Sequence, residues 1–141
     1  MSANIEAKSK ATGRKEAWVL IARSGKTTDG RYVAAETLID VANTYNPKLF
    51  PSWITFPSLQ TPHTLACIAA LRVEIEEDET ALYALTGEFN FFGKPCAEKA
   101  LYPCPEIDMK FSLTGKPYLV GIRLSTTPVI KNIPTINHLF K

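Results

Sequence analysis

Residues 106–125 read EIDMKFSLTGKPYLVGIRLS, and the alternation within this stretch decides the fold class. Apolar and polar side chains alternate over residues 106–112, which is typical of a strand with one buried face. A Thr-Gly-Lys turn follows at residues 114–116, and the alternation resumes over residues 118–125. Two such segments on either side of a glycine turn predict neighbouring strands in one sheet.

Segments upstream of this pair add further strands and a helix. Residues 17–23 form a short apolar run that predicts a buried strand, and residues 53–56 predict another. Between them, residues 36–45 carry apolar side chains at helical spacing. The helix is expected to end there because Asn46 precedes Pro47, and a residue before proline avoids the α region.

A hairpin is expected in the middle of the chain. Residues 71–75 alternate between apolar and charged side chains, and the acidic run at residues 76–79 predicts a solvated turn. The return strand is predicted to bury an apolar face made of Tyr83, Leu85, Phe89 and Phe91. A short helix over residues 94–101 is a further expectation.

Together these segments predict an α+β fold, a β-rich barrel-like domain of about six to seven strands with one to three flanking helices. A length of 141 residues suits one such domain with its own core. Lysine and arginine are frequent in residues 1–16, and we expect this stretch to be a disordered basic tail. Residues 17–141 are then the single folded domain.

The composition narrows the range of functions. A net charge of +2 gives no support for nucleic acid as a partner. No apolar run approaches the ~20 residues that a membrane span needs, so no membrane association is predicted. The odd number of cysteines (Cys67, Cys96 and Cys104), with no C-x-x-C spacing, favours reduced thiols in a cytosolic protein. No side-chain cluster has the spacing of zinc ligands, and we predict neither a metal nor a cofactor.

Three stretches, in this order, resemble the GPO family, the capsid-scaffold serine proteases of temperate contractile-tailed phages. They are TDGR at residues 28–31 with YNP at 45–47, ITF at 54–56, and YPCPEI at 102–107 with TGK at 114–116. The turn STTP at residues 125–128 matches the family as well, and the resemblance covers about residues 17 to 130.

The resemblance implies a protease domain of the kind shared with herpesvirus assemblins, a β-barrel flanked by helices. Family members cleave themselves and the coat proteins during prohead maturation. They usually continue into a long helical scaffolding tail that organises the coat protein. This chain ends at Lys141, and we expect it to carry no such tail.

Carried over position by position, the family's Ser-His-Asp triad is altered in this chain. Asp29 matches the aspartate of the D-G-R motif, Ser58 stands at the position of the histidine, and Cys104 stands at that of the nucleophilic serine. A thiolate can replace a serine nucleophile, but a serine cannot act as a general base near neutral pH. Pro105 in addition has no N–H to offer an oxyanion hole.

Two hypotheses follow from these substitutions. In the first, the chain is a non-catalytic capsid-assembly protein of a phage, prophage or phage satellite, in which Cys104 is an inert thiol and Asp29 a turn residue. Its partner would be the major coat protein or another head protein, in the bacterial host cytoplasm, the procapsid or the virion, with self-association left open. In the second, the chain is an active cysteine peptidase that uses Cys104 with Asp29 and with His63, which lies five residues beyond the matched position. A DNA-contacting head component that uses the basic tail is a third, weaker hypothesis.

Overall fold

A computed structural model describes residues 17–56, 63–87 and 100–136 of the chain. In chain order, the elements of these ranges are β1 (Ala17–Arg23), β2 (Gly25–Lys26), β3 (Tyr32–Val33), α2 (Ala35–Thr44), β4 (Trp53–Phe56), β5 (His63–Ile75), β6 (Thr80–Thr86), β7 (Tyr102–Asp108) and β8 (Tyr118–Ser125). The tail predicted for residues 1–16 and most of the helix predicted for residues 94–101 lie outside the described residues.

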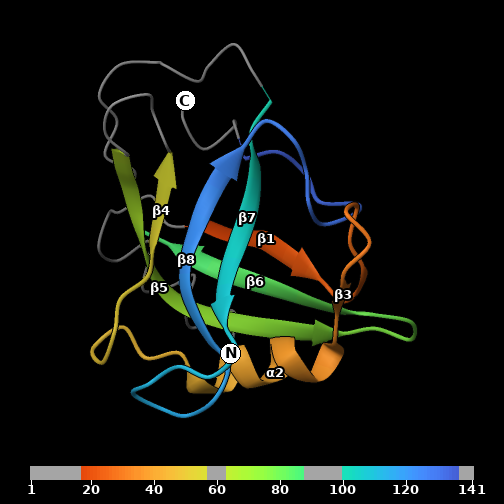
Figure 1. Cartoon of the computed structure of the whole chain (residues 1–141). Coiled ribbons are helices and arrows are strands. Elements are labelled where there is room, and N and C mark those ends of the chain that lie inside the picture. Colours follow the sequence, from red (N-terminus) through yellow and green to blue (C-terminus); the bar gives the residue numbers. More distant parts are fainter. Residues whose placement is uncertain (1–16, 57–62, 88–99, 137–141) are drawn as a thin grey trace.

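Six strands form one curled sheet in the order β1-β6-β5-β4-β8-β7, and β2 pairs with β3 in a small separate ribbon. Figure 1 shows β7 and β8 crossing in front of β1 and β6, and the two outer strands β1 and β7 contact each other. Every antiparallel pairing in the six-stranded sheet contains a register irregularity. Because bulges bend strands and increase their twist, they allow the sheet to close into a half-barrel. The predicted α+β, β-rich fold class is confirmed.

The strand β5 is the corner of this half-barrel. Its first residues pair with β4 up to Cys67, and its later residues pair with β6 from Ile68 onwards. The register to β6 shifts between Ile68 and Ala70. A single strand of 13 residues therefore belongs to both halves of the sheet and carries the bend between them.

The helix α2 packs against β5, β6 and β8 at the lower end of the half-barrel (Figure 1). Its Leu38 and Val41 are fully buried, and burying each such side chain stabilises the fold by about 1.5–3 kcal/mol. Tyr45 caps the helix in an extended conformation, as the sequence Asn46-Pro47 predicts. The fully buried side chains of the main core come from α2, from both halves of the sheet and from the segments before β7 and after β8: Ile21, Ala22, Leu38, Val41, Ile54, Ala66, Ile68, Leu82, Ala84, Leu101, Leu119, Ile122 and Ile136.

The C-terminal strand pair exists, but its first strand begins earlier than predicted. β7 runs from Tyr102 to Asp108 and pairs antiparallel with β8, whereas the alternation had indicated residues 106–112. Pro103 and Pro105 hide the strand in the sequence, yet β7 is an end strand, where a proline without its N–H is tolerated.

The return strand of the central hairpin buries more than its predicted face. Leu82 and Ala84, of the opposite parity, are in the main core, while Tyr83 and Leu85 lie on the other face. β6 lies between β1 and β5, so both of its edges are paired, and consecutive residues of the strand are buried, so both of its faces are covered as well. Phe89 and Phe91 lie outside the described residues. The predicted turn at residues 76–79 is present and is closed by a hydrogen bond from the Glu76 N–H to the Glu79 carbonyl.

Candidate functional site

Cys104 lies in the middle of β7, opposite Arg123 on β8 and between Pro103 and Pro105. Because β7 is an end strand of the sheet, one of its edges is hydrogen-bonded to no other strand of the described residues. A hollow of about 720 Å³ opens along this edge and is lined by all of residues 104–109. Consecutive residues alternate between the two faces of a strand, so the unbroken run places the hollow along β7, and Val120 and Arg123 extend its lining onto the neighbouring β8.

The opposite wall of the hollow comes from the small ribbon and the start of α2. Residues 31–34 line it together with Thr37, and Val129 and Ile130 line it beyond the end of β8. Two large apolar side chains of the lining are exposed to solvent, Tyr32 at 73% and Met109 at 59%. The hollow therefore combines a strand edge with exposed apolar side chains.

The Cys104 thiol has the electrostatics of a buried cysteine. Its residue is only 7% exposed, and burial raises the pKa of the thiol above its usual value. The Val129 backbone, the Arg123 charge and the Ser125 hydroxyl act in the opposite direction but do not outweigh burial. Reactive cysteines show the reverse, a pKa lowered by a base or a positive site.

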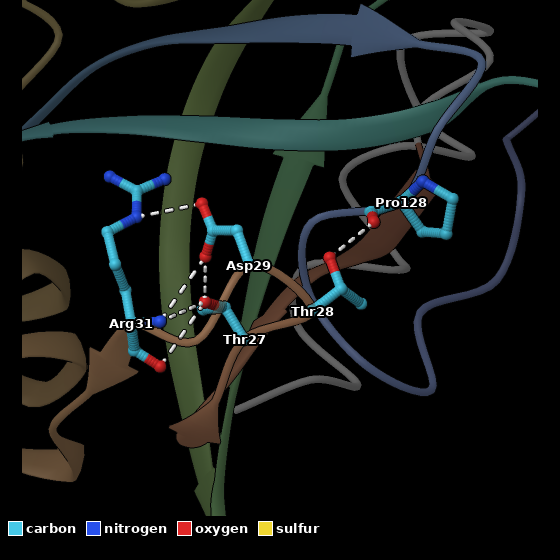
Figure 2. A network of polar contacts seen from close by, with 5 residues as sticks. All are labelled: Thr27, Thr28, Asp29, Arg31 and Pro128. Atoms are coloured by element: carbon cyan, nitrogen blue, oxygen red, sulfur yellow. Dashed lines mark hydrogen bonds and ion pairs between the residues drawn. The ribbon is translucent and has the colours of Figure 1, made fainter.

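Asp29 is occupied within its own loop, as Figure 2 shows. Its carboxylate accepts a hydrogen bond from the Thr27 hydroxyl, and it accepts from the Arg31 Nε at 3.0 Å and the Arg31 N–H at 3.4 Å. The Thr27 hydrogen bond is the first cause of a pKa below the usual value for this carboxyl. Gly30 has a φ of +90°, which closes the turn. Thr27 and Arg31 line the hollow beside Cys104, and Asp29 is not among the lining residues.

The same loop holds the segment that follows β8. The Thr28 N–H donates to the Val129 carbonyl at 2.9 Å, and the Thr28 hydroxyl donates to the Pro128 carbonyl at 2.9 Å (Figure 2). The next residue, Ile130, is buried against Leu20 and Ala81. The chain after β8 thus returns to the edge of β7, where the Val129 backbone meets the Cys104 thiol.

His63 is the first residue of β5, and two strands, β4 and β8, separate β5 from β7. Cys104 lies opposite Arg123, and Arg123 lies opposite Thr55 on β4. The His63 backbone is therefore three strand spacings from that of Cys104, about 14 Å along the sheet. Ser58 lies outside the described residues. The assignment of catalytic roles to these positions stays a prediction.

Two further findings describe the surroundings of the site. Among the residues that the structure describes, no group of three or more His, Cys, Asp or Glu side chains could hold a metal ion. Within the same ranges, no helix has both the length and the apolar character needed to cross a bilayer.

The sequence analysis did not predict that the chain after β8 packs back against the domain. The apolar residues Ile130, Ile133 and Ile136, spaced by three, were the available signal. All three are buried, and the Ile136 N–H donates to the Leu101 carbonyl at 3.0 Å. Such a spacing indicates buried side chains, but it does not specify the surface against which they pack.

The β-rich half-barrel carries the YPCPEI motif, with Cys104, in an end strand and the TDGR motif in a loop beside the same hollow. The chain belongs to the GPO family: the family model described as GPO serine peptidase, N-terminal domain, matches residues 16–132. The resemblance carried by the TDGR and YPCPEI motifs is thereby confirmed.

A curated relative is similar in sequence. The capsid assembly scaffolding protein of Escherichia phage P2 is 28% identical over 120 residues, which cover 74% of this chain and 41% of the relative. The chain thus spans less than half the length of the relative that it matches. No solved structure gives a significant match.

Proposed function

We propose that the chain is a capsid-assembly protein of a phage, prophage or phage satellite that binds coat or other head proteins without cleaving them. Membership of a peptidase family and similarity to a capsid assembly scaffolding protein support the assembly role. A place in the host cytoplasm, the procapsid or the virion follows from that role. The observation that carries the absence of cleavage is the buried Cys104 thiol with its raised pKa.

Catalysis would require Cys104 to lose its proton to a nearby base. The raised pKa keeps the thiol protonated near neutral pH, and a protonated thiol is a poor nucleophile. Asp29, the one triad residue that matches the family, makes its hydrogen bonds to Thr27 and Arg31. Pro103 and Pro105 offer no N–H on either side of Cys104 to stabilise an oxyanion.

Binding requires only a surface, and the hollow supplies one. Tyr32 and Met109 place exposed apolar side chains on its lining, and exposed apolar groups around a concave site mark sites of interaction. The Arg31 and Arg123 side chains add donors for polar groups of a partner. We therefore assign the head-protein contact to this hollow.

The binding experiment compares exposed apolar residues inside and outside the hollow. Purified protein is titrated with the major coat protein encoded by the same phage, prophage or satellite. Tyr32→Glu and Met109→Glu should each weaken binding by about tenfold or more, because a charge replaces an apolar contact. Ile75→Glu is the control, since Ile75 is 71% exposed and does not line the hollow. If the unmodified chain and the three variants bind with equal affinity, the hollow is not the binding site.

A cleavage assay tests the catalytic part of the proposal. The protein is incubated under reducing conditions, alone and with the coat protein, beside Cys104→Ala and His63→Ala variants. We expect no cleavage in any sample. Cleavage by the unmodified chain that disappears in both variants would overturn the proposal and establish the cysteine peptidase, because loss of a triad member typically costs about 10⁴-fold in rate.

A further inference from the structure

The segment that follows β8, residues 126–130, passes beside Cys104 of β7. We call it the strap. At its far end, Ile130 is buried against Leu20 and Ala81, and at its near end it continues from Ser125 of β8. Between these two fixed ends, Val129 lines the hollow beside Cys104.

We propose that the strap is a cover for the Cys104 thiol, and that the Thr28 loop is its latch. Two hydrogen bonds of 2.9 Å, from the Thr28 N–H and hydroxyl to the carbonyls of Val129 and Pro128, hold the strap down. Thr126 and Thr127 in the first half of the strap are exposed. When the latch opens, the Val129 backbone leaves the thiol, and Cys104 becomes accessible from the hollow.

Asp29 is a positioning residue for this latch. Its carboxylate ties Thr27 to Arg31, and the Thr27 N–H donates to the Arg31 carbonyl at 2.8 Å, which fixes the loop on both sides of Thr28. Asp29 therefore acts on access to Cys104 through the orientation of Thr28. The inference concerns the Cys104 thiol alone and does not rest on the proposed function.

The test measures access to the Cys104 thiol in the protein alone. A parent protein with Cys67→Ser and Cys96→Ser leaves one thiol, and its rate of alkylation by iodoacetamide is followed by intact-mass spectrometry. Removal of the Thr28 hydroxyl in Thr28→Val should make alkylation about fivefold faster, the effect of losing one hydrogen bond on a local opening equilibrium. Asp29→Ala should increase the rate further.

Thr44→Val is the matched control. The Thr44 hydroxyl donates to the Pro117 carbonyl at 2.8 Å, the same kind of bond at a place remote from the strap. Its alkylation rate should stay within about twofold of the parent's, since only local bonds set local opening. Equal acceleration in both threonine variants would show general loosening and overturn the proposal, as would no acceleration in Thr28→Val and Asp29→Ala.

A second measurement tests the role of Asp29 at the latch directly. Hydrogen exchange at the amide of residue 28, which is bonded to Val129, should become faster in Asp29→Asn while the amides of β6 stay protected. Unchanged exchange would overturn the role of Asp29. Because no head protein is present, these results are independent of whether a partner binds the hollow.

Discussion

Two regions of the half-barrel are held together in different ways. In one, which we call the aromatic corner, Tyr45, Phe50, Phe111 and Tyr118 join the end of α2 to the starts of β4 and β8, and the rings of Phe111 and Tyr118 stack at 4.5 Å. In the other, the strap and its latch, hydrogen bonds between exposed residues hold the chain across the hollow.

The two regions differ in how much each of their hydrogen bonds contributes to the stability of the fold. The Tyr118 hydroxyl accepts from the Asn46 N–H at 3.1 Å and donates to the Phe50 carbonyl at 2.7 Å, and its ring is fully buried. A buried polar group that loses its partner is costly, whereas an exposed one turns to water. The fold thus depends on the aromatic corner, and the site residues can change with little effect on the fold.

Among the substitutions that we predict, Tyr118→Phe should lower the stability of the fold the most. It leaves the Asn46 N–H and the Phe50 carbonyl without their partner, which we expect to lower the free energy of unfolding by about 2–4 kcal/mol in urea titrations. Tyr83→Phe is the control, because the Tyr83 hydroxyl makes no hydrogen bond within the described ranges and its ring contacts Arg72. A similar loss of unfolding free energy in both variants would contradict the special contribution of the aromatic corner to stability.

Tyr45→Phe should have the next largest effect. The Tyr45 hydroxyl donates to the Ile68 carbonyl at 2.6 Å and accepts from the Ser52 N–H at 3.0 Å, so its removal should cost about 1–3 kcal/mol. Burial raises the pKa of Tyr45 to about 12, above the unfolded value of about 10.

The same tyrosine makes a prediction about pH. Its folded pKa is raised, so its contribution is present below the unfolded pKa and is lost as the pH rises through the folded one. The free energy of unfolding of the unmodified chain should fall more steeply between about pH 10 and 12 than that of Tyr45→Phe. Parallel pH profiles would contradict a buried, hydrogen-bonded hydroxyl at this position.

Asp29→Asn should have the smallest effect on the fold. Asp29 is exposed, and the urea midpoint of this variant should stay close to that of the unmodified chain at pH 7. Its folded pKa is lowered, so its contribution is present above the unfolded value of about 3.9 and disappears as the pH falls through the folded pKa. A large shift of the midpoint at pH 7 would place Asp29 among the residues on which the fold depends.

Local patterns in the sequence were enough to predict the elements with a regular hydrophobic periodicity or a clear stop signal. The helix that ends before Asn46-Pro47 and the turn at Gly115, with a φ of +73°, lie where the sequence indicates. The start of β7 was missed because Pro103 and Pro105 disfavour a strand everywhere except at a sheet edge, and edge position is a property of the topology.

The candidate site was predictable only in part, for the same reason. The resemblance of TDGR and YPCPEI to the family indicated Asp29 and Cys104, and both lie beside or near one hollow. The latch between Thr28 and Val129 joins residues about a hundred positions apart, and no local pattern encodes such a pair. Chain order also could not say that β4 and β8 separate the His63 backbone from β7.

The most direct test of the central claim, that the hollow is not a catalytic centre, is the pH dependence of Cys104 alkylation. The protein carries Cys67→Ser and Cys96→Ser, and the rate is measured from about pH 5 to pH 10 in the folded range. A buried thiol with a raised pKa predicts a rate that is low near neutral pH and still rising above pH 8.5 or so, the usual thiol value. A rate that reaches its plateau below about pH 7 would reveal a stabilised thiolate, and would contradict the account.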